Sequence, residues 1–190
     1  MVDEDGITGD VRSREEEYFR RKDRELVEKM RQEAAASRAR QELEARSGLH
    51  DPALLQELEA LGFTPDTIGL LPLVPIVQVA WAEGGVSPEE RTLIERLARQ
   101  RGIDAGGAAG RQLSAWLETR PSEDVFARAR RLIRAMLDEP GEARQDVSVD
   151  DLIRQCEEIA AASGGVLGFR KISPLERALL GEIEAALKAR

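Results

Sequence analysis

Large apolar residues are sparse in the first quarter of the chain and frequent in the rest. Between Ser13 and Arg46 there is no glycine or proline, and nearly every residue favours a helix. The apolar residues of this stretch follow a spacing of seven, four and four, at Phe19, Leu26, Met30 and Ala34. Such a stripe is too narrow to bury a helix in a core. The pattern therefore predicts an exposed, charged helix over residues 13–48 that projects from the rest of the protein.

Both ends of this helix carry recognisable signals. Ser13, with Glu16 three residues later, matches a capping box, and Gly48 is a typical helix-ending residue. Residues 1–12 are acidic, contain glycine and have few bulky apolar side chains. Because such a segment buries too little apolar surface to offset its ordering entropy, we expect a disordered tail in the free protein.

From residue 49 onward, apolar residues recur with helical spacing. In residues 122–137 they occupy positions 125, 126, 129, 132, 133, 136 and 137, which form one face of a helix. The run from Leu70 to Ala82 is predicted to be a buried central helix, with its two prolines in or before the first turn. No segment alternates with the period of a strand. The predicted fold class is all-α, with residues 49–190 forming one multi-helix domain.

A short pattern occurs twice in this domain. Residues 87–90 read Ser-Pro-Glu-Glu and residues 173–176 read Ser-Pro-Leu-Glu, and a Gly-Gly pair precedes each copy. Serine at the N-cap, proline at the first helical position and glutamate three residues after serine predict a capped helix start in both places. The repetition predicts a helical bundle built from two related halves.

Composition argues against several classes of function. The 190-residue chain has a net charge of −8, which disfavours sequence-independent binding to nucleic acid. Cys156 is the single cysteine, so neither an intrachain disulfide nor a multi-cysteine metal site can form. No stretch approaches the roughly 20 apolar residues of a transmembrane helix, and the acidic N-terminus is unlike a secretory leader. We therefore expect a cytoplasmic protein.

The sequence lacks the common motifs of enzyme active sites. It contains no Gly-x-Ser-x-Gly elbow, no phosphate-binding loop ending in Lys-Ser or Lys-Thr, and no His-Glu-x-x-His. The one histidine, His50, precedes an Asp-Pro helix start, which is typical of a surface position. We predict that the protein is not an enzyme and requires no cofactor.

An acidic corner is the first candidate site. Glu83 precedes Gly84-Gly85, and Glu90 lies in the first turn of the next predicted helix, so their carboxylates can converge across the turn. Carboxylate oxygens suit Ca²⁺ or Mg²⁺. Helix capping explains Glu90 equally well. Metal binding and capping therefore remain alternatives, and two carboxylates are expected to give weak cation binding at most.

This corner resembles a known family. Residues 80–90 read Ala-Trp-Ala-Glu-Gly-Gly-Val-Ser-Pro-Glu-Glu, which is similar to the signature of the tellurite-resistance TerB-like family. The resemblance extends over about residues 64–190 and implies a two-half helical bundle, divalent-metal binding and a role in stress-response or membrane-associated complexes. It places Glu83 and Glu90 at family positions of the metal site. Gly85 and Ser163 stand where acidic residues are expected, which weakens the implied site.

The second candidate site lies on the N-terminal helix. Residues 15–20 read Glu-Glu-Glu-Tyr-Phe-Arg and are followed by Glu25 and Val27. This resembles the inhibitory helix of the F-type ATPase inhibitor family, with Val27 in place of leucine. In that family the helix wedges between catalytic subunits, so the resemblance implies an F-type ATPase as the partner of residues 13–46. The predicted partner-binding residues are Glu15, Glu16, Tyr18, Phe19, Arg20, Glu25, Leu26 and Met30.

The two adjacent aromatic residues of this helix have more than one interpretation. Tyr18 and Phe19 are either anchors for a protein partner or residues that pack on the body or pair with a second copy in a coiled coil. The sequence thus predicts a non-enzymatic regulatory or interaction protein whose N-terminal helix docks on a partner. The alternative is a divalent-cation-binding stress-response protein.

Overall fold

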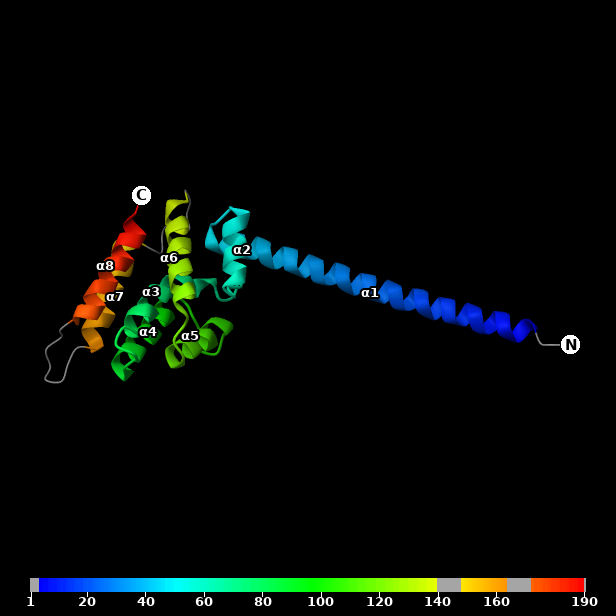
Figure 1. Cartoon of the computed structure of the whole chain (residues 1–190), viewed down its shortest axis with the longest axis horizontal. Coiled ribbons are helices and arrows are strands. Elements are labelled where there is room, and N and C mark those ends of the chain that lie inside the picture. The colour runs from blue at the N-terminus through cyan, green and yellow to red at the C-terminus, as the bar shows by residue number, and fades with distance from the viewer. Residues whose placement is uncertain (1–3, 140–147, 164–171, 190) are drawn as a thin grey trace. The chain divides into compact units, whose positions relative to one another are not determined.

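The computed structural model describes residues 4–139, 148–163 and 172–189, with the backbone alone for residues 4–15 and 163. Within these ranges it contains eight α-helices, one 3-10 helix and no strand (Figure 1). The predicted all-α fold class is therefore confirmed. The chain divides into two compact units, residues 1–41 and residues 42–190.

The first unit consists of a single helix, α1, which spans Glu4–Ser47 and continues into the second unit. The helix begins at Glu4, so the capping box predicted at Ser13 does not start it. Residues 4–12, expected to form a disordered tail, are helical. Gly6 and Gly9 disfavour a helix by about 1 kcal/mol each. A helix already nucleated by the following residues nevertheless extends one residue at a time, without a second nucleation step.

The last turn of α1 belongs to the second unit. Leu43 is buried in the apolar core, and Ser47 is also buried. Gly48 follows with a positive φ of 70°, which glycine adopts without strain and which ends the helix as predicted. The compact unit therefore begins at Glu42 instead of at residue 49, because Leu43 contributes to the core.

The second unit is built around α3, which spans Val74–Ala80. Every residue of α3 is buried, and the helix packs against α4, α6, α7 and α8. The stretch predicted as one central helix is two elements, because the 3-10 helix η1 spans Ile68–Leu73 and contains Pro72. Pro75 lies in the first turn of α3. Proline has no N–H to donate, so the α-helix starts at the one place where that donor is not required.

Six further α-helices complete the second unit, and serine or aspartate caps most of their starts. Their bounds are Pro52–Ala60 (α2), Pro88–Gln100 (α4), Ala108–Glu118 (α5), Glu123–Asp138 (α6), Val149–Ser163 (α7) and Pro174–Lys188 (α8). The side chains of Asp51, Ser87, Ser122, Ser148 and Ser173 each accept a backbone N–H from the first turn that follows. The helix starts predicted at Asp51-Pro52, Ser87 and Ser173 are thus confirmed.

An ion-pair cluster joins α2 to α6. Glu57 of α2 accepts hydrogen bonds from Arg128, at 2.9 Å, and from Arg131. The side chain of Glu57 is largely buried. Burial opposes ionisation of this carboxyl, but the two arginines outweigh it, so the pKa of Glu57 is lowered. The ionised form of Glu57 is therefore the form that holds these two helices together.

We expect Glu57→Gln to lower the free energy of unfolding by about 1 kcal/mol at pH 7. A lowered folded-state pKa stabilises the protein above the unfolded-state pKa, and this stabilisation disappears as pH falls through the folded-state value. The difference from wild type should therefore shrink below about pH 4.5. Urea unfolding at several pH values measures it, with the exposed Glu182→Gln as control. A difference that is independent of pH would contradict this assignment.

Candidate protein-docking site

Five large apolar side chains of α1 are exposed to solvent. Their exposed fractions are 48% for Tyr18, 62% for Phe19, 57% for Leu26, 46% for Val27 and 60% for Met30. Among the side chains that the structure describes, Leu175 is the one other large apolar residue this exposed. Exposed apolar residues concentrated in one segment are typical of an interaction surface.

Three of these residues form a line along the helix, here named the apolar stripe: Phe19, Leu26 and Met30. At 3.6 residues per turn, their positions fall within an arc of about 40°, and the stripe is about 16 Å long. Tyr18 and Val27 lie on its two sides. The stripe is therefore a short contact surface with aromatic residues at one end.

The two aromatic rings differ in their local contacts. Tyr18 and Phe19 meet edge to face, with 5.9 Å between ring centroids. The cationic groups of Arg21 and Lys22 also lie 5.7 and 5.9 Å from the centroid of the Tyr18 ring. Cations at such positions interact favourably with a ring face. Tyr18 is thus held by neighbours on its own helix, and Phe19 is the more available anchor.

The predicted polar residues of this site form ion pairs along the helix surface. Glu16 lies 3.8 Å from Arg20, and Glu25 lies 3.3 Å from Lys22 and 4.0 Å from Arg21. All are well exposed, so each pair contributes a few tenths of a kcal/mol to helix stability. The side chain of Glu15 lies outside the described residues.

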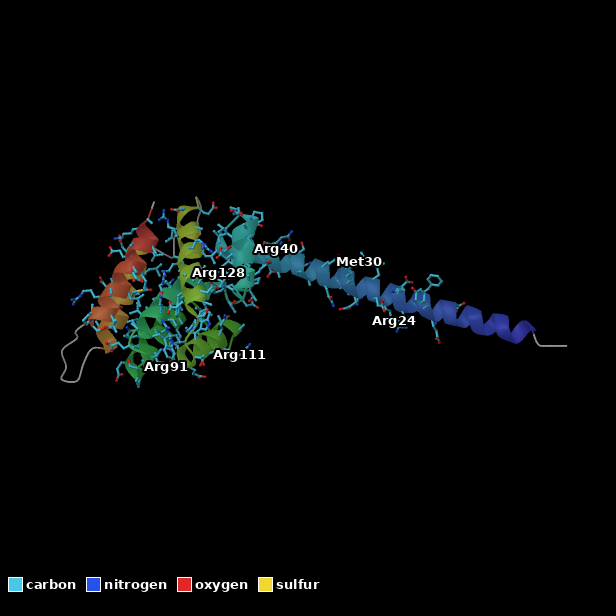
Figure 2. All side chains as sticks on the ribbon, viewed as in Figure 1. Arg24, Met30, Arg40, Arg91, Arg111 and Arg128 are labelled. Carbon is cyan, nitrogen blue, oxygen red and sulfur yellow. The ribbon has the colours of Figure 1, made fainter. Side chains whose placement is uncertain are left out.

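Four arginines lie along one side of the apolar stripe and are here named the arginine row: Arg20, Arg24, Arg31 and Arg38. All are exposed, and helical geometry places them about 100–140° around the axis from Phe19. Figure 2 shows Arg24 and Met30 on α1. The prediction from sequence included Arg20 alone. The signal for the others was the seven-residue spacing of Arg24, Arg31 and Arg38.

The acidic corner is occupied by a helix cap. Glu90 is only 2% exposed, its Oε2 accepts the Ser87 N–H at 2.7 Å, and its own N–H donates to Ser87 Oγ at 3.2 Å. Glu83 is exposed. Burial raises the pKa of Glu90, and this effect outweighs the hydrogen bonds from Ser87, which lower the pKa. The charges of Glu176 and Glu83 raise it further. No cluster of three potential metal ligands occurs among the described residues.

The second capping box has the same geometry. Glu176 is 1% exposed, and its Oε2 accepts the Ser173 N–H at 2.7 Å. The charge of Glu176 is one of the causes that raise the pKa of Glu90, so the two capping glutamates are electrostatically coupled. The repeated motif was visible in the sequence, but the electrostatic effect of the second copy on the first was not, because it depends on how α4 and α8 each pack on α3 and α7.

The second unit also contains a cavity of about 1000 Å³. Apolar residues such as Ile68, Leu97 and Met136 line part of it. At its edge Arg101 donates a hydrogen bond to Gln155 Oε1 at 3.0 Å. None of the site residues predicted from the sequence lines this cavity.

The cysteine and the histidine have contrasting environments. Cys156 is fully buried in the core, and burial, together with the charge of Glu157, raises the pKa of its thiol to about 12. The reactive thiolate is therefore scarce at neutral pH. His50 is exposed and its Nδ1 lies 3.0 Å from a carboxylate oxygen of Glu44, which raises the pKa of the imidazole.

In the described part of the chain, no helix has the length and apolar character needed to cross a membrane.

Comparison with known proteins does not place the chain in a family. The resemblances to the TerB-like and ATPase-inhibitor families rest on the residues named above and stay predictions. Searches against models of protein families, against curated proteins and against solved structures gave no match.

Proposed function

We propose that this protein is a regulator that docks the apolar stripe of α1 on a protein partner. The observation that supports this most directly is the exposure of five large apolar side chains on one helix segment. A helix that binds in a groove uses anchors three, four or seven residues apart, and aromatic anchors often dominate the binding energy. Phe19, Leu26 and Met30 have this spacing.

Pairing of the stripe with a second copy is less well supported. If Phe19 and Leu26 occupy core positions of a heptad repeat, then Asp23, Glu33 and Ser37 occupy the neighbouring core positions. A stable coiled coil requires apolar residues at these positions over three or four heptads. The stripe is therefore better matched to a short groove on a different protein.

An F-type ATPase is the proposed partner. The resemblance of residues 15–25 to the inhibitory helix of the ATPase inhibitor family supports this choice. Tyr18 and Phe19, which are central to that resemblance, are both exposed and available for docking. On this proposal α1 enters the interface between catalytic subunits and slows ATP hydrolysis by blocking rotation.

We expect the full chain to inhibit ATP hydrolysis by purified bacterial F-type ATPase. Changing Tyr18 and Phe19 together to alanine should raise the half-inhibitory concentration at least about tenfold, since interface aromatics often contribute more than 1 kcal/mol each. Alanine favours a helix more than either aromatic residue, so α1 should remain folded. Leu175→Ala changes an exposed apolar residue outside α1 and serves as the control.

Two results would count against the proposal in different ways. Absence of inhibition by the wild-type chain at tens of micromolar, a weak-binding level, would exclude the ATPase as the partner. Inhibition that is equally strong in the double alanine variant would show that the contact does not involve the aromatic end of the stripe.

We further propose that residues 64–190 form a TerB-like bundle of two related halves. The contact between α3 and α7 supports this, because α4 and α8 follow these two helices and both begin with a Ser-Pro capping box. Gly164-Gly165, the second glycine pair, lies outside the described residues. The burial of Glu90 in its cap is consistent with weak Ca²⁺ or Mg²⁺ binding at most, and a stress-response role stays a prediction.

A further inference from the structure

The charges beside the apolar stripe indicate the chemistry of the partner surface that binds the stripe. We propose that the groove on the partner is bordered on one side by a row of carboxylates that pair with the arginine row of α1. This inference rests on the proposed docking function and specifies the chemistry of the partner surface.

The geometry of the arginine row is regular. Arg24, Arg31 and Arg38 are seven residues apart, so successive guanidinium groups leave the helix at intervals of about 10.5 Å along its axis. With Arg20, they stay within an arc of about 40° that runs beside the stripe. Between residues 18 and 41, no acidic residue falls within this arc. The row therefore presents charge of a single sign along about 27 Å of helix.

The two sides of the stripe differ in how their charges are compensated. On the opposite side, Lys22 pairs with Glu25 at 3.3 Å and Lys29 pairs with Glu33 at 3.8 Å. Within the arginine row, Arg20 lies 3.8 Å from Glu16. Arg24, Arg31 and Arg38 form no ion pair with any residue whose side chain is described. The side that carries the arginine row thus has uncompensated positive charge at Arg24, Arg31 and Arg38, next to the apolar stripe.

When the apolar stripe docks, the partner surface must compensate the positive charge of the arginine row. In water an exposed guanidinium is well solvated, but it loses part of that solvation when a protein surface covers the neighbouring stripe. An uncompensated charge at such an edge is costly, and a guanidinium presents paired donors that match a carboxylate. A groove with carboxylates along this edge therefore binds α1 more tightly than a neutral groove does.

Carboxylates fit the chain better than phosphates. Residues 20–40 contain eight arginines and lysines and four acidic residues, an excess of four positive charges. The whole chain nevertheless has a net charge of −8, so the rest of the protein is repelled by a nucleic acid or an anionic membrane. An apolar groove with a local acidic edge avoids this repulsion.

The experiment compares two double variants of the full chain in the inhibition of purified bacterial F-type ATPase. One variant neutralises part of the row by changing Arg31 and Arg38 to glutamine. The matched control changes Lys29 and Arg40 to glutamine, which removes the same number of charges from the other side of the same helix and leaves the cations beside Tyr18 in place. Glutamine has a helix propensity close to that of arginine and lysine, and circular dichroism checks that α1 stays helical in both.

We expect the row variant to raise the half-inhibitory concentration at least about tenfold and the control to raise it less than about threefold. Inhibition by the wild type should weaken with added salt, and the row variant should lose most of this dependence. Equal losses in the two variants would overturn the inference and leave the docking function standing. No inhibition by the wild-type chain would overturn the docking function on the ATPase and the inference with it.

Discussion

Replacing Phe126 with alanine is expected to lower the free energy of unfolding by about 3–5 kcal/mol. Phe126 lies in α6 and is completely buried. Helix α6 packs against both α3 and α8. Loss of the ring removes buried apolar surface and leaves a cavity, because the surrounding helices relax only partly into the empty space. Urea unfolding followed by circular dichroism measures the change.

Two further variants, one at the surface and one in the core, serve as controls for this prediction. Leu175→Ala alters an exposed apolar side chain and should change stability by less than about 0.5 kcal/mol. Phe126→Leu retains part of the buried volume and should fall between wild type and Phe126→Ala, which provides a measurement if the alanine variant fails to fold. A loss below about 1 kcal/mol for Phe126→Ala would show that the described core around α6 is wrong.

Replacing Glu90 with alanine is expected to destabilise the protein by about 1–3 kcal/mol. The carboxylate of Glu90 accepts the backbone N–H of Ser87, and its removal leaves this donor without its partner at a partly buried helix start. Glu90→Gln is the informative comparison, because an amide oxygen also accepts this bond. The free energy of unfolding of the glutamine variant should be much closer to that of wild type, and this variant does not bury a charge.

The comparison between wild type and Glu90→Gln should also depend on pH. The folded-state pKa of Glu90 is raised, chiefly by burial. Its contribution to stability is therefore complete below the unfolded-state pKa and is lost as pH rises through the folded-state value. Relative to wild type, Glu90→Gln should become more stable as pH rises from about 4 to 7. Glu89→Gln, an exposed change in the same turn, is the control, and the same pH trend in both variants would contradict the assignment.

Local signals made most of the second unit predictable. Ser87 and Ser173 cap helices where the sequence pattern placed them, because a cap depends on only a few neighbouring residues. The start of α1 was missed because capping signals at Ser13 did not outweigh continued helix growth toward Glu4. The division between η1 and α3 was missed because an apolar run does not distinguish one helix from two short ones.

Different parts of the candidate site were predictable for different reasons. The exposure of Phe19, Leu26 and Met30 follows from a stripe that is too narrow to be buried. The burial of Leu43, which continues the same helix, depends on contacts with a core formed by distant residues. The electrostatic effect of Glu176 on Glu90 likewise depends on packing, and no single helix carries a signal for it.

The two buried glutamates also constrain how this sequence can change over evolution. Each is needed as a cap at its own helix start, yet the charge of Glu176 makes ionisation of Glu90 less favourable. A glutamine at position 176 would retain the cap there and remove a charge that disfavours ionisation of Glu90. Substitutions at positions 90 and 176 are therefore epistatic: the effect of each depends on the residue present at the other helix start.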